Sequence, residues 1–515
     1  MDKPIKRIVI VGAGSAGWIT AGILAAEHCT SALSDIKLVL IESPNVATIG
    51  VGEGTWPSMR NTLERMGINE LEFLSKCDAS FKQGSKFVNW NNLSQSDFYY
   101  HPFMTPDGYG QIDLHGAWQS YYKKQSFADA INIQSHVCEA GLAPKQQGTP
   151  AYAAVTNYGY HLDAGKFAQL LKEHCTSKLS VEHILAHVDG IISSENGDIQ
   201  AIQTAKHGNI EGDLFIDCTG QQSLLLGKHY KVNMISQKHI LFNDSALALQ
   251  VPYCSENDAI ASATISSAQT AGWIWDIGLQ SRRGVGYTYS SEHISDEQAK
   301  QDLLAYVASS QGGQSADNLA PKKLSFIPGY REEFWHKNCL AIGMSAGFIE
   351  PLEASALAMV ELSVSMLSDE LPRTRKHMDI ISKRFNARFT YRWQRVIDFL
   401  KLHYVLSERN DSQYWLDNKQ GDSISESLQE MLRLWQFQPP SRYDFVQNEE
   451  IFPSASYQYV LYGMGFNTQQ STHKQPSKSS KFAVQAIETV QGKVHQYLSG
   501  LPTNRVLLNA LKELQ

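Results

Sequence analysis

The beginning of the chain combines two apolar runs with a glycine-rich turn. An apolar run at 8–11 leads into glycines at positions 12, 14 and 17, and a stretch rich in helix-forming residues follows at once. A second apolar run at 36–41 ends at Glu42. Short apolar runs bounded by turn residues are typical of buried strands. The pattern therefore predicts a strand, a tight turn, a helix and a second strand.

Helical spacing of apolar residues recurs further along the chain. It predicts a helix at 58–77 and a long amphipathic helix at 383–407. A third predicted helix follows Asp163, whose carboxylate can accept a hydrogen bond from the first turn. A fourth is expected to begin at Pro351, a residue suited to the first helical position. Glu353 would then lie in the first turn, where the helix dipole favours a carboxylate.

Period-two alternation predicts several strands. Residues 80–90 alternate as one strand, on which Lys82 and Lys86 share one face with Gly84 and Val88, whereas Phe81, Gln83, Ser85 and Phe87 share the other. A lysine on a strand is typical of a solvated edge. Between 223 and 326 the alternating segments are short and predict an antiparallel sheet. They are 247–253, 273–277 and 286–290.

Two further apolar segments, 213–220 and 339–343, are expected to return to the first sheet as strands, and a strand pair is expected through Val188 and Ile202. Two aromatic features have alternative interpretations. Trp273 and Trp275 would share one strand face, a pattern that occurs mostly in cores. The aromatic-rich region 98–122 fits either a core or a wall for a flat ligand.

The composition narrows the function classes. The chain has 515 residues, 43% hydrophobic and 19% charged, with a formal net charge of −7. More than one lobe is expected, and no basic run marks a nucleic-acid partner. The seven cysteines form no C-x-x-C pair, so we expect neither a metal site nor a disulfide framework. No segment predicts a signal peptide or a membrane span, and we expect a cytoplasmic protein.

The glycine spacing G-x-G-x-x-G is typical of a dinucleotide-binding turn when it lies between a strand and a helix. Gly12 would permit the tight turn, Gly14 would let the backbone approach a pyrophosphate, and Gly17 would let helix and strand pack closely. Glu42 is placed to accept a hydrogen bond from a ribose hydroxyl. The alternative is an ordinary glycine-rich turn between a strand and a helix.

These elements predict an α/β chain with a Rossmann-type fold, an inserted β-rich lobe and a mainly helical C-terminal region. The glycine turn resembles that of flavoprotein monooxygenases, and this resemblance implies that the fold is of their kind and binds FAD. We assign 1–225 and 327–370 to the FAD-binding domain, with 80–160 partly contributing to the substrate lobe. The β-rich substrate lobe is 226–326. The helical region 371–515 would complete the substrate site.

Five segments resemble the flavin-dependent tryptophan halogenase family over roughly residues 6–465. They are GAGSAGW with Trp18, GVGEGTWP at 50–57, ASFKQGSKFVNW at 79–90, GWIWDIGL at 272–279 and FIEPLEAS at 348–355. The second segment resembles the loop that links flavin and substrate sites, although a surface loop is its other interpretation. The lysine segment and the W-x-W segment together are specific, whereas the glycine turn alone fits any flavoprotein monooxygenase.

The resemblance implies a role for particular residues. The catalytic lysine falls on Lys82 rather than Lys86, its acidic partner on Glu353, and the halide-binding amides on Ser355 and Ala356. It places Trp273 and Trp275 near the flavin. The cofactor-binding residues that we assign are Gly12, Gly14, Ala16, Gly17, Glu42, Gly50, Val188, Met344 and Leu357. The substrate ring is expected to contact His101, Phe103 and Tyr457.

Three positions depart from the family pattern. Gly278 replaces the proline of the W-x-W-x-I-P signature, Ala356 replaces a glycine at the halide site, and Tyr457 stands where the family usually has a tryptophan. The methyl group of Ala356 can reshape the halide site, so we consider bromide over chloride as the preferred halide. Free tryptophan, indole and a larger indole-bearing molecule all stay open as substrates.

The implied reaction uses reduced FAD, O2 and halide to make hypohalous acid, which halogenates an electron-rich aromatic ring through Lys82. Lys82 would act either as an ammonium that polarises this acid or as an amine that forms a haloamine. The implied partner is a separate NAD(P)H-dependent flavin reductase, and a homodimer is among the expected assemblies. Two alternatives are a flavin-dependent aromatic hydroxylase and a flavin-binding protein without turnover.

Overall fold

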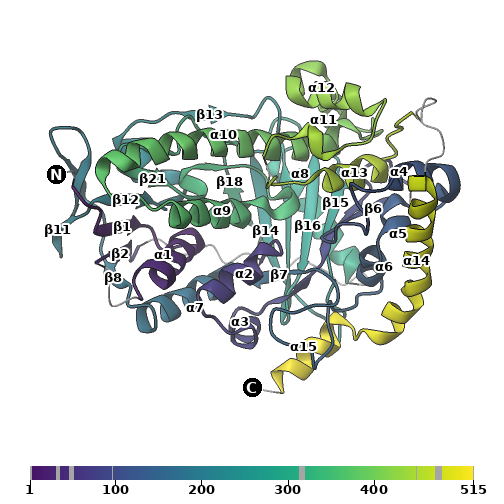
Figure 1. Ribbon diagram of the computed structural model, residues 1–515, viewed down its shortest axis with the longest axis horizontal. Helices are drawn as coiled ribbons and strands as arrows, with labels where there is room; N and C mark the ends of the chain where they lie inside the picture. Colours follow the sequence, from purple (N-terminus) through teal and green to yellow (C-terminus); the bar gives the residue numbers. More distant parts are fainter. Residues whose placement is uncertain are drawn as a thin grey trace. The chain divides into compact units, whose positions relative to one another are not determined.

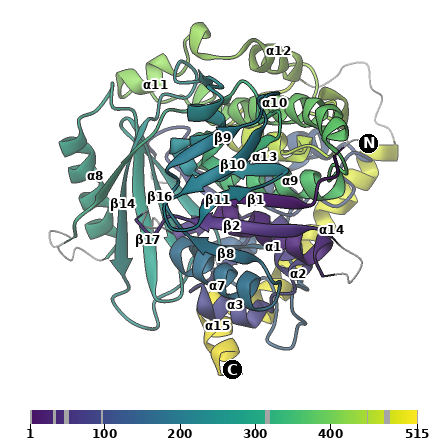
Figure 2. The same cartoon turned by 90° about the vertical axis from the view of Figure 1, so that its left-hand side faces the viewer.

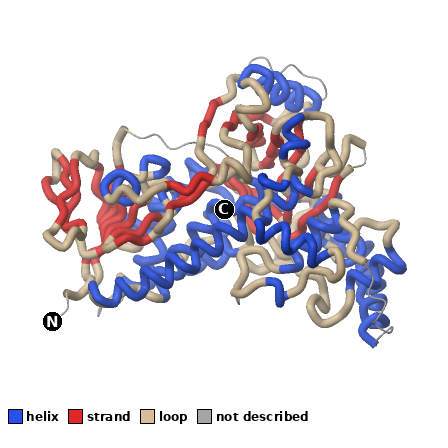
Figure 3. The backbone as a smooth tube through the Cα atoms, turned by 90° about the horizontal axis from the view of Figure 1, so that it is seen from above, coloured by secondary structure: helices blue, strands red, loops and turns tan. Residues whose placement is uncertain are grey.

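The computed structural model describes residues 3–30, 35–45, 52–94, 97–311, 319–447, 449–469 and 478–513. The chain forms two compact units, and each is assembled from three separate segments. Unit 1 comprises 1–79, 162–238 and 326–393, whereas unit 2 comprises 80–161, 239–325 and 394–515. Both units combine helices with strands, and Figure 3 shows the helices in blue and the strands in red. The three functional regions predicted from the sequence stay a prediction.

Unit 1 is built on a six-stranded sheet in the order β20-β21-β12-β1-β2-β8. Its central strand β1 (Arg7–Val11) is parallel to β2 (Lys37–Glu42) and to β12 (Leu214–Asp217). The side chains of Ile8, Val9 and Ile10 are fully buried, because both faces of a parallel sheet are covered. Figure 2 shows β1, β2 and β8 (Glu182–Leu185) side by side. The predicted first two strands and the predicted returning strands are therefore confirmed.

Helices of unit 1 pack on this sheet. Helix α1 (Ser15–His28) follows the glycine turn and packs against α7 (Ala164–Ser177) and α9 (Ser355–Asp369). Asp163 caps α7 as predicted, since its carboxylate accepts a hydrogen bond of 3.0 Å from the backbone N–H of Lys166. Unit 1 also contains α2 (Ser58–Arg65), α3 (Glu70–Lys76), β3 (Gly52–Gly54), β20 (Trp335–His336) and β21 (Cys339–Ala341).

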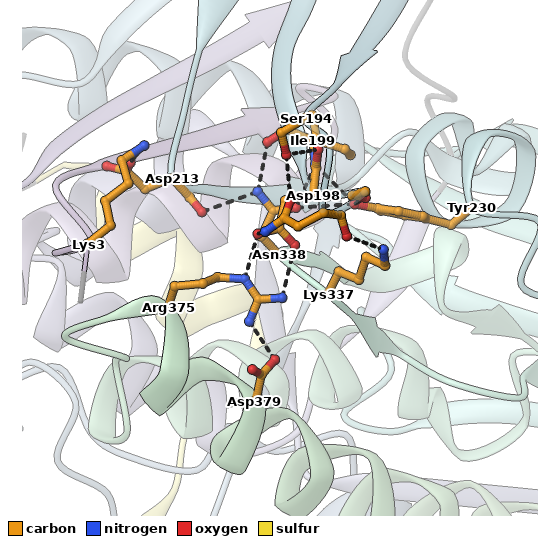
Figure 4. Close-up of polar contacts among 12 residues, drawn as sticks. Lys3, Ser194, Asp198, Ile199, Asp213, Tyr230, Lys337, Asn338, Arg375 and Asp379 are labelled. Atoms are coloured by element: carbon orange, nitrogen blue, oxygen red, sulfur yellow. Dashed lines mark hydrogen bonds and ion pairs between the residues drawn. The ribbon is translucent and has the colours of Figure 1, made fainter. Parts of the chain in front are cut away.

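Two small antiparallel sheets complete unit 1. One contains β9 (Gly190–Ser193), β10 (Ile199–Thr204) and β11 (Gly208–Glu211), and the other contains β13 (Met234–Ser236), β19 (Gly329–Arg331) and β22 (Gly347–Phe348). Figure 4 shows how the first of these is attached. The Arg375 guanidinium binds both oxygens of Asp198 at 2.7 and 2.9 Å, and the Asn338 amide donates to the Ile199 carbonyl at 2.8 Å. Val188 precedes β9, so the predicted strand pair begins after it.

Unit 2 is built on a seven-stranded sheet in the order β18-β14-β17-β16-β15-β5-β6. The strands β14 to β17 are antiparallel, as predicted, and β5 is parallel to β15. Their apolar face packs on α8 (Asp296–Ser310) through Ala299, Leu303 and Val307. The strands are β5 (Gly84–Val88), β6 (Phe98–Pro102), β14 (Ser245–Pro252), β15 (Thr264–Gln269), β16 (Gly272–Gly278), β17 (Arg282–Tyr289) and β18 (Lys322–Ser325).

Most other elements of unit 2 are helical. In Figure 1, α14 runs beside α4, α5 and α6, against which it packs. The helices are α4 (Leu114–Ala117), α5 (Phe127–Ile131), α6 (Gln134–Glu139), α11 (Gln413–Asp417), α12 (Glu426–Trp435), α13 (Ser454–Gly463), α14 (Lys478–Gly500) and α15 (Asn504–Lys512). Helix α10 (Arg375–Val405) begins in unit 1 and ends in unit 2. Among the described residues, no helix has the length and apolar composition needed to cross a bilayer.

Several predicted boundaries were wrong. The helix predicted at 58–77 is two helices, because Gly67 takes a φ of +74° between α2 and α3. The long helix α10 starts eight positions before the predicted residue 383, at Arg375. The strand predicted at 80–90 is also two elements, β4 (Ser80–Lys82) and β5. In the two interrupted elements the apolar spacing continued across a break that backbone geometry imposed, whereas α10 is one uninterrupted helix that begins earlier than predicted.

Candidate active site

The glycine turn after β1 has the geometry that each glycine was expected to provide. Gly12 has a φ of +107°, and a Cβ there would lie 2.2 Å from the Cys218 carbonyl oxygen. A Cβ at Gly17 would lie 1.9 Å from the Gly12 carbonyl oxygen, so only glycine lets helix and strand approach this closely. A Cβ at Gly14 would meet nothing within 4 Å. The open position is therefore the one predicted to approach a phosphate.

The start of α1 completes a cradle for an anion. Gly14 is the N-cap of α1 and has no side-chain cap, so the first backbone N–H groups of the helix point outward without intrahelical partners. These groups and the positive end of the helix dipole suit a pyrophosphate. Ala16 lies beside Gly343, where a Cβ would come 2.8 Å from the Ala16 Cβ. The turn thus lies at the carboxyl ends of β1, β12 and β21, where open α/β sheets bind their ligands.

Other predicted cofactor residues lie in the same unit. The Glu42 carboxylate already accepts hydrogen bonds from Lys172 Nζ at 2.9 Å and from His183 Nε2 at 2.6 Å. A ribose hydroxyl that binds Glu42 would therefore share the carboxylate with these two donors. Val188 is half-buried ahead of β9, and Met344 is half-buried in the short 3₁₀ turn at Gly343–Ser345. Leu357 is buried in the first turn of α9. Gly50 lies outside the described residues.

The segment before α9 differs from the predicted helix start. Pro351 precedes a 3₁₀ turn, Leu352–Ala354, and α9 begins only at Ser355. Glu353 and Ala354 have φ values of +62° and +55°, a left-handed conformation that costs about 1–3 kcal/mol for a residue with a Cβ. Glu353 is therefore not in the first turn of a helix, and the dipole explanation for its carboxylate was wrong. Two adjacent strained residues are typical of functional sites.

This strained segment is held by a hydrogen bond that sequence reasoning did not anticipate. The indole Nε1 of Trp56 donates to the Glu353 carbonyl at 2.7 Å, and the Ala354 N–H donates to the Pro351 carbonyl at 3.0 Å. The Glu353 side chain is buried. Ser355 and Ala356 are the first two residues of α9, so their N–H groups lack intrahelical acceptors. Ser355 is buried and Ala356 is exposed.

Two carboxyls with raised pKa values lie close to these elements in the sequence. Burial raises the pKa of Glu361, on α9, to about 7, although hydrogen bonds from the Thr62 and Ser58 hydroxyls and the charge of Arg65 partly oppose this. Burial and the negative charge of Asp163 raise the pKa of Glu53 to about 7. Both groups therefore change protonation near neutral pH.

In unit 2, Lys82 is the last residue of β4, and its side chain is only 1% exposed. The solvated edge position that is usual for a strand lysine is therefore not what the structure shows. Lys82 Nζ lies 5.3 Å from the centre of the Phe103 ring. By contrast, Lys86 binds Glu139 at 2.6 Å and is partly exposed. Of the two lysines, the buried one matches the position that the family resemblance assigned to catalysis.

His161 is a second residue that sequence reasoning missed. It lies on β7 (Gly159–Asp163), opposite Ser80, in an antiparallel pair that places Lys82 opposite Gly159. Burial and then the positive charge of Lys82 lower the pKa of His161 well below its ordinary value. Its Nε2 is hydrogen-bonded to the Thr264 hydroxyl at 2.8 Å. The only sequence signal was a lone histidine in the segment GYHLD, which folds into the fully buried strand β7.

The predicted substrate residues share an aromatic environment in unit 2. His101, on β6, contacts the Phe399 ring at 5.6 Å between centroids, and Tyr457, on α13, contacts the same ring at 4.8 Å. His101 Nε2 is also hydrogen-bonded to the Ser456 hydroxyl at 2.9 Å. Phe399 thus connects two of the three predicted residues, and Phe103 lies beside Lys82.

The two tryptophans of β16 are neighbours, as their spacing predicted. The centroids of the Trp273 and Trp275 rings are 6.2 Å apart, and both side chains are buried. Trp275 packs onto Gly286, where a Cβ would lie 2.1 Å from the indole ring. Trp273 contacts Trp90 at 6.4 Å. These contacts make the pair part of the interior of unit 2, and a position near the flavin stays a prediction.

Comparison with known proteins gives consistent matches over most of the chain. The family model for tryptophan halogenase matches residues 7–478. The 7-chloro-L-tryptophan 6-halogenase KtzR of a Kutzneria strain is 31% identical over 483 residues, covering 89% of this chain and 90% of that protein. A tryptophan halogenase structure from Shewanella frigidimarina is similar with a TM-score of 0.96 and 52% identity, covering 99% of this chain and 98% of the other.

A third similar protein is described as a tryptophan C-6 flavin-dependent halogenase, a chlorinase from taromycin biosynthesis. It superimposes with a TM-score of 0.91 and is 31% identical, covering 98% of this chain and 100% of the other. The matches therefore span both units rather than the glycine turn alone.

Proposed function

Because the chain belongs to the tryptophan halogenase family of flavin-dependent halogenases, we propose that it halogenates an electron-rich aromatic ring of the indole type, with Lys82 as the residue that delivers the halogen. The observation that carries this proposal is the position of Lys82, which is 1% exposed and has its Nζ 5.3 Å from the Phe103 ring. A buried amine beside an aromatic ring can hold an electrophilic halogen where a flat substrate would stack.

The FAD cofactor fits the turn after β1. The open face of Gly14 and the free N–H groups at the start of α1 would hold the pyrophosphate, and Gly12, Ala16 and Gly17 shape the turn around it. The other residues assigned to the cofactor are Glu42, Gly50, Val188, Met344 and Leu357. Reduced FAD, when bound, would activate O2 so that it oxidises halide to hypohalous acid.

The chain contributes a halide site and an acid–base group. The backbone N–H groups of Ser355 and Ala356 open α9, and a helix start favours an anion. The carboxylate of Glu353 would orient Lys82 or take the proton that the substrate ring loses on halogenation. The strained backbone at Glu353 and the hydrogen bond from Trp56 support this assignment, because strain of this kind persists where a side chain must be aimed.

The substrate would stack on aromatic side chains of unit 2. We assign His101, Phe103 and Tyr457 to this role, and Trp273 and Trp275 to excluding competing oxygenation. The related proteins carry names that specify tryptophan or 7-chlorotryptophan. For this chain we propose the shared chemistry, an indole ring, with tryptophan, free indole and larger indole-bearing molecules as its forms. A separate NAD(P)H-dependent flavin reductase would supply the reduced cofactor.

An aerobic assay tests this function. The enzyme would be incubated with FAD, a flavin reductase and NADH, and with indole or tryptophan in the presence of bromide or chloride, followed by mass spectrometry. We expect products with a bromine or chlorine isotope pattern that require the enzyme and the halide. A halide-independent gain of one oxygen would contradict the proposal and indicate a hydroxylase.

A further inference from the structure

The residue that follows Lys82 connects two different sheets. Strand β4 ends at Lys82 and pairs with β7, whereas β5 begins at Gly84 and pairs with β6 and β15. Gln83 alone lies between them. The conformation of Gln83 therefore sets the direction of the Lys82 backbone. The contacts of Gln83 hold the chain where it passes from β4 to β5.

Gln83 is fully buried and every polar group of this residue is hydrogen-bonded. Its backbone N–H donates to the Ser262 carbonyl at 2.7 Å, and its carbonyl accepts from the Phe103 N–H at 3.1 Å. Its side-chain amide donates to the Leu142 carbonyl at 2.7 Å and accepts from the Thr156 hydroxyl at 2.6 Å. The backbone of Phe103, the ring beside Lys82, is thus bound to the same residue that orients Lys82.

On the other side of Lys82, the backbone is held from the C-terminal end of the chain. The side-chain Nδ2 of Asn504 donates to the Phe81 carbonyl at 3.0 Å. Asn504 is fully buried and is the first residue of α15. Its own backbone N–H donates to the Gly141 carbonyl at 2.9 Å. A single asparagine side chain therefore connects the start of α15 to the strand of Lys82.

The two sides are joined through residues 141–143. Leu142 pairs with Thr503 in an antiparallel bridge, and the Ala143 N–H donates to the Pro502 carbonyl at 2.8 Å. The Leu142 carbonyl is the acceptor for the Gln83 side chain. The hydrogen bonds thus connect Phe81 to Gln83 through α15 and Leu142. Lys82 lies between Phe81 and Gln83 in the chain, so its backbone is held on both sides.

A second buried side chain anchors α15. The Arg505 guanidinium donates to the Asp258 carbonyl at 2.9 Å and to the Gln280 carbonyl at 2.6 Å, and it lies 4.8 Å from the centre of the Tyr253 ring. Arg505 is 8% exposed. Two polar side chains at the start of one short helix therefore point into unit 2, which is unusual for a terminal helix that only covers apolar surface.

We propose that Asn504 and Gln83 are positioning residues for Lys82, and that α15 is therefore part of the scaffold of the active site. The proposal rests on the proposed function of Lys82. Helix α15 lies beyond residue 478, where the match to the family model ends. The physical reason is that the reach of a lysine amine depends on its backbone, and a displacement of about 1 Å at a reacting group can cost about 100-fold in rate.

The test compares two identical substitutions on one helix. Asn504→Asp replaces the Nδ2 donor by an oxygen that repels the Phe81 carbonyl while keeping the size of the side chain. Asn509→Asp is the matched control, because Asn509 is exposed on the same helix. Both full-length variants would be examined by hydrogen–deuterium exchange of the peptide that covers 79–90, by FAD titration, and by halogenation kinetics with indole and bromide.

In Asn504→Asp we expect the backbone amides of β4 to exchange hydrogen for deuterium faster than in the wild type. We expect kcat to fall about 10- to 100-fold. The KM for indole and the affinity for FAD should change less than about twofold, because the substrate rings and the glycine turn are untouched. Asn509→Asp should match the wild type in all measurements. Wild-type exchange and kcat in Asn504→Asp would overturn the proposal, as would an equal effect of Asn509→Asp.

The exchange measurement separates this proposal from the proposed function. If the wild type halogenates neither indole nor tryptophan, the function fails, whereas faster exchange at 79–90 in Asn504→Asp alone still establishes the role of α15 in holding β4. If circular dichroism shows that Asn504→Asp does not fold, the same measurements would be made on the milder variant Asn504→Ala. An unchanged β4 in a folded Asn504→Ala would then overturn the proposal.

Discussion

The glycine turn at 12–17 and the lysine strand at 80–90 are both short segments interrupted by glycine, yet only the first was predicted correctly in detail. In the turn, the Gly17 position is filled by the carbonyl of Gly12, five residues away. In the lysine segment, Gly84 has a φ of +157°, and a Cβ there would lie 2.5 Å from the carbonyl of His101 on β6. The first constraint is local, and the second comes from a neighbouring strand.

This difference explains the error at Lys82. Period-two alternation predicts which side chains share a face only while the chain stays in one sheet. At Gln83 the chain leaves the β4–β7 pair and enters the seven-stranded sheet. Lys82 and Lys86, expected on one face, consequently have different environments, one buried and one paired with Glu139 at the surface.

The largest expected effect tests this contrast directly. Lys82→Ala should lower halogenation by more than about 1,000-fold, because it removes the group that carries the halogen. FAD binding should stay within about twofold, since the glycine turn is in the other unit. Lys86→Ala should retain most activity. Mass spectrometry of the product and FAD titration measure these effects, and a Lys82→Ala variant that halogenates at the normal rate would refute the assignment.

The second prediction concerns the strained segment of unit 1. Glu353→Gln keeps the shape of the side chain but removes its charge and basicity. We expect the turnover number to fall about 100-fold, a typical contribution of a general base. The thermal unfolding midpoint should change little. An unchanged turnover number would show that the left-handed conformation at Glu353 serves a purpose other than proton transfer.

The third prediction sharpens the interpretation of the glycine turn. Gly17→Ala would place a methyl group 1.9 Å from the Gly12 carbonyl oxygen. We expect it to destabilise the protein by about 1–3 kcal/mol or more, as overpacking does. Gly14→Ala enters open space and should leave the unfolding midpoint unchanged while FAD affinity falls about tenfold, or about 1.4 kcal/mol. Equal effects on stability would contradict the distinct roles of the two glycines.

The last prediction is a pH dependence from Glu361. Its pKa is raised from an ordinary value of 4.5 to about 7 by burial. The folded protein therefore binds more protons than the unfolded chain between these values, and stability is lost as the pH rises through this range. Glu361→Gln removes that loss.

Relative to the wild type, Glu361→Gln should gain on the order of 2 kcal/mol between pH 5 and pH 8. Unfolding midpoints at the two pH values would measure this gain. Glu53, whose pKa burial also raises to about 7, is present in both proteins and cancels in the comparison. A constant difference between variant and wild type across this range would indicate that Glu361 has an ordinary pKa.

The segment before α9 shows a second limit of prediction from local pattern. Pro351 and an acidic residue two positions later are typical of a helix start, and that was the prediction. The structure instead places two left-handed residues, Glu353 and Ala354, before the helix. The bond from Trp56, almost 300 positions earlier in the chain, helps hold this conformation. No local propensity would have predicted it, because alanine and glutamate both favour the helical region.

The sequence by itself determined the elements whose reasons are local. These are the strand–turn–helix unit with its three glycines, the Asp163 cap, the antiparallel strands of unit 2, and the motifs that resemble the halogenase family. Backbone sterics and side-chain periodicity act over a few residues, so they can be recognised without a fold. The burial of Lys82, the sheet change at Gln83, the left-handed Glu353 and the bond from Asn504 to Phe81 were decided by tertiary structure. Each depends on atoms distant in the chain, which only the folded protein brings within a hydrogen bond's length.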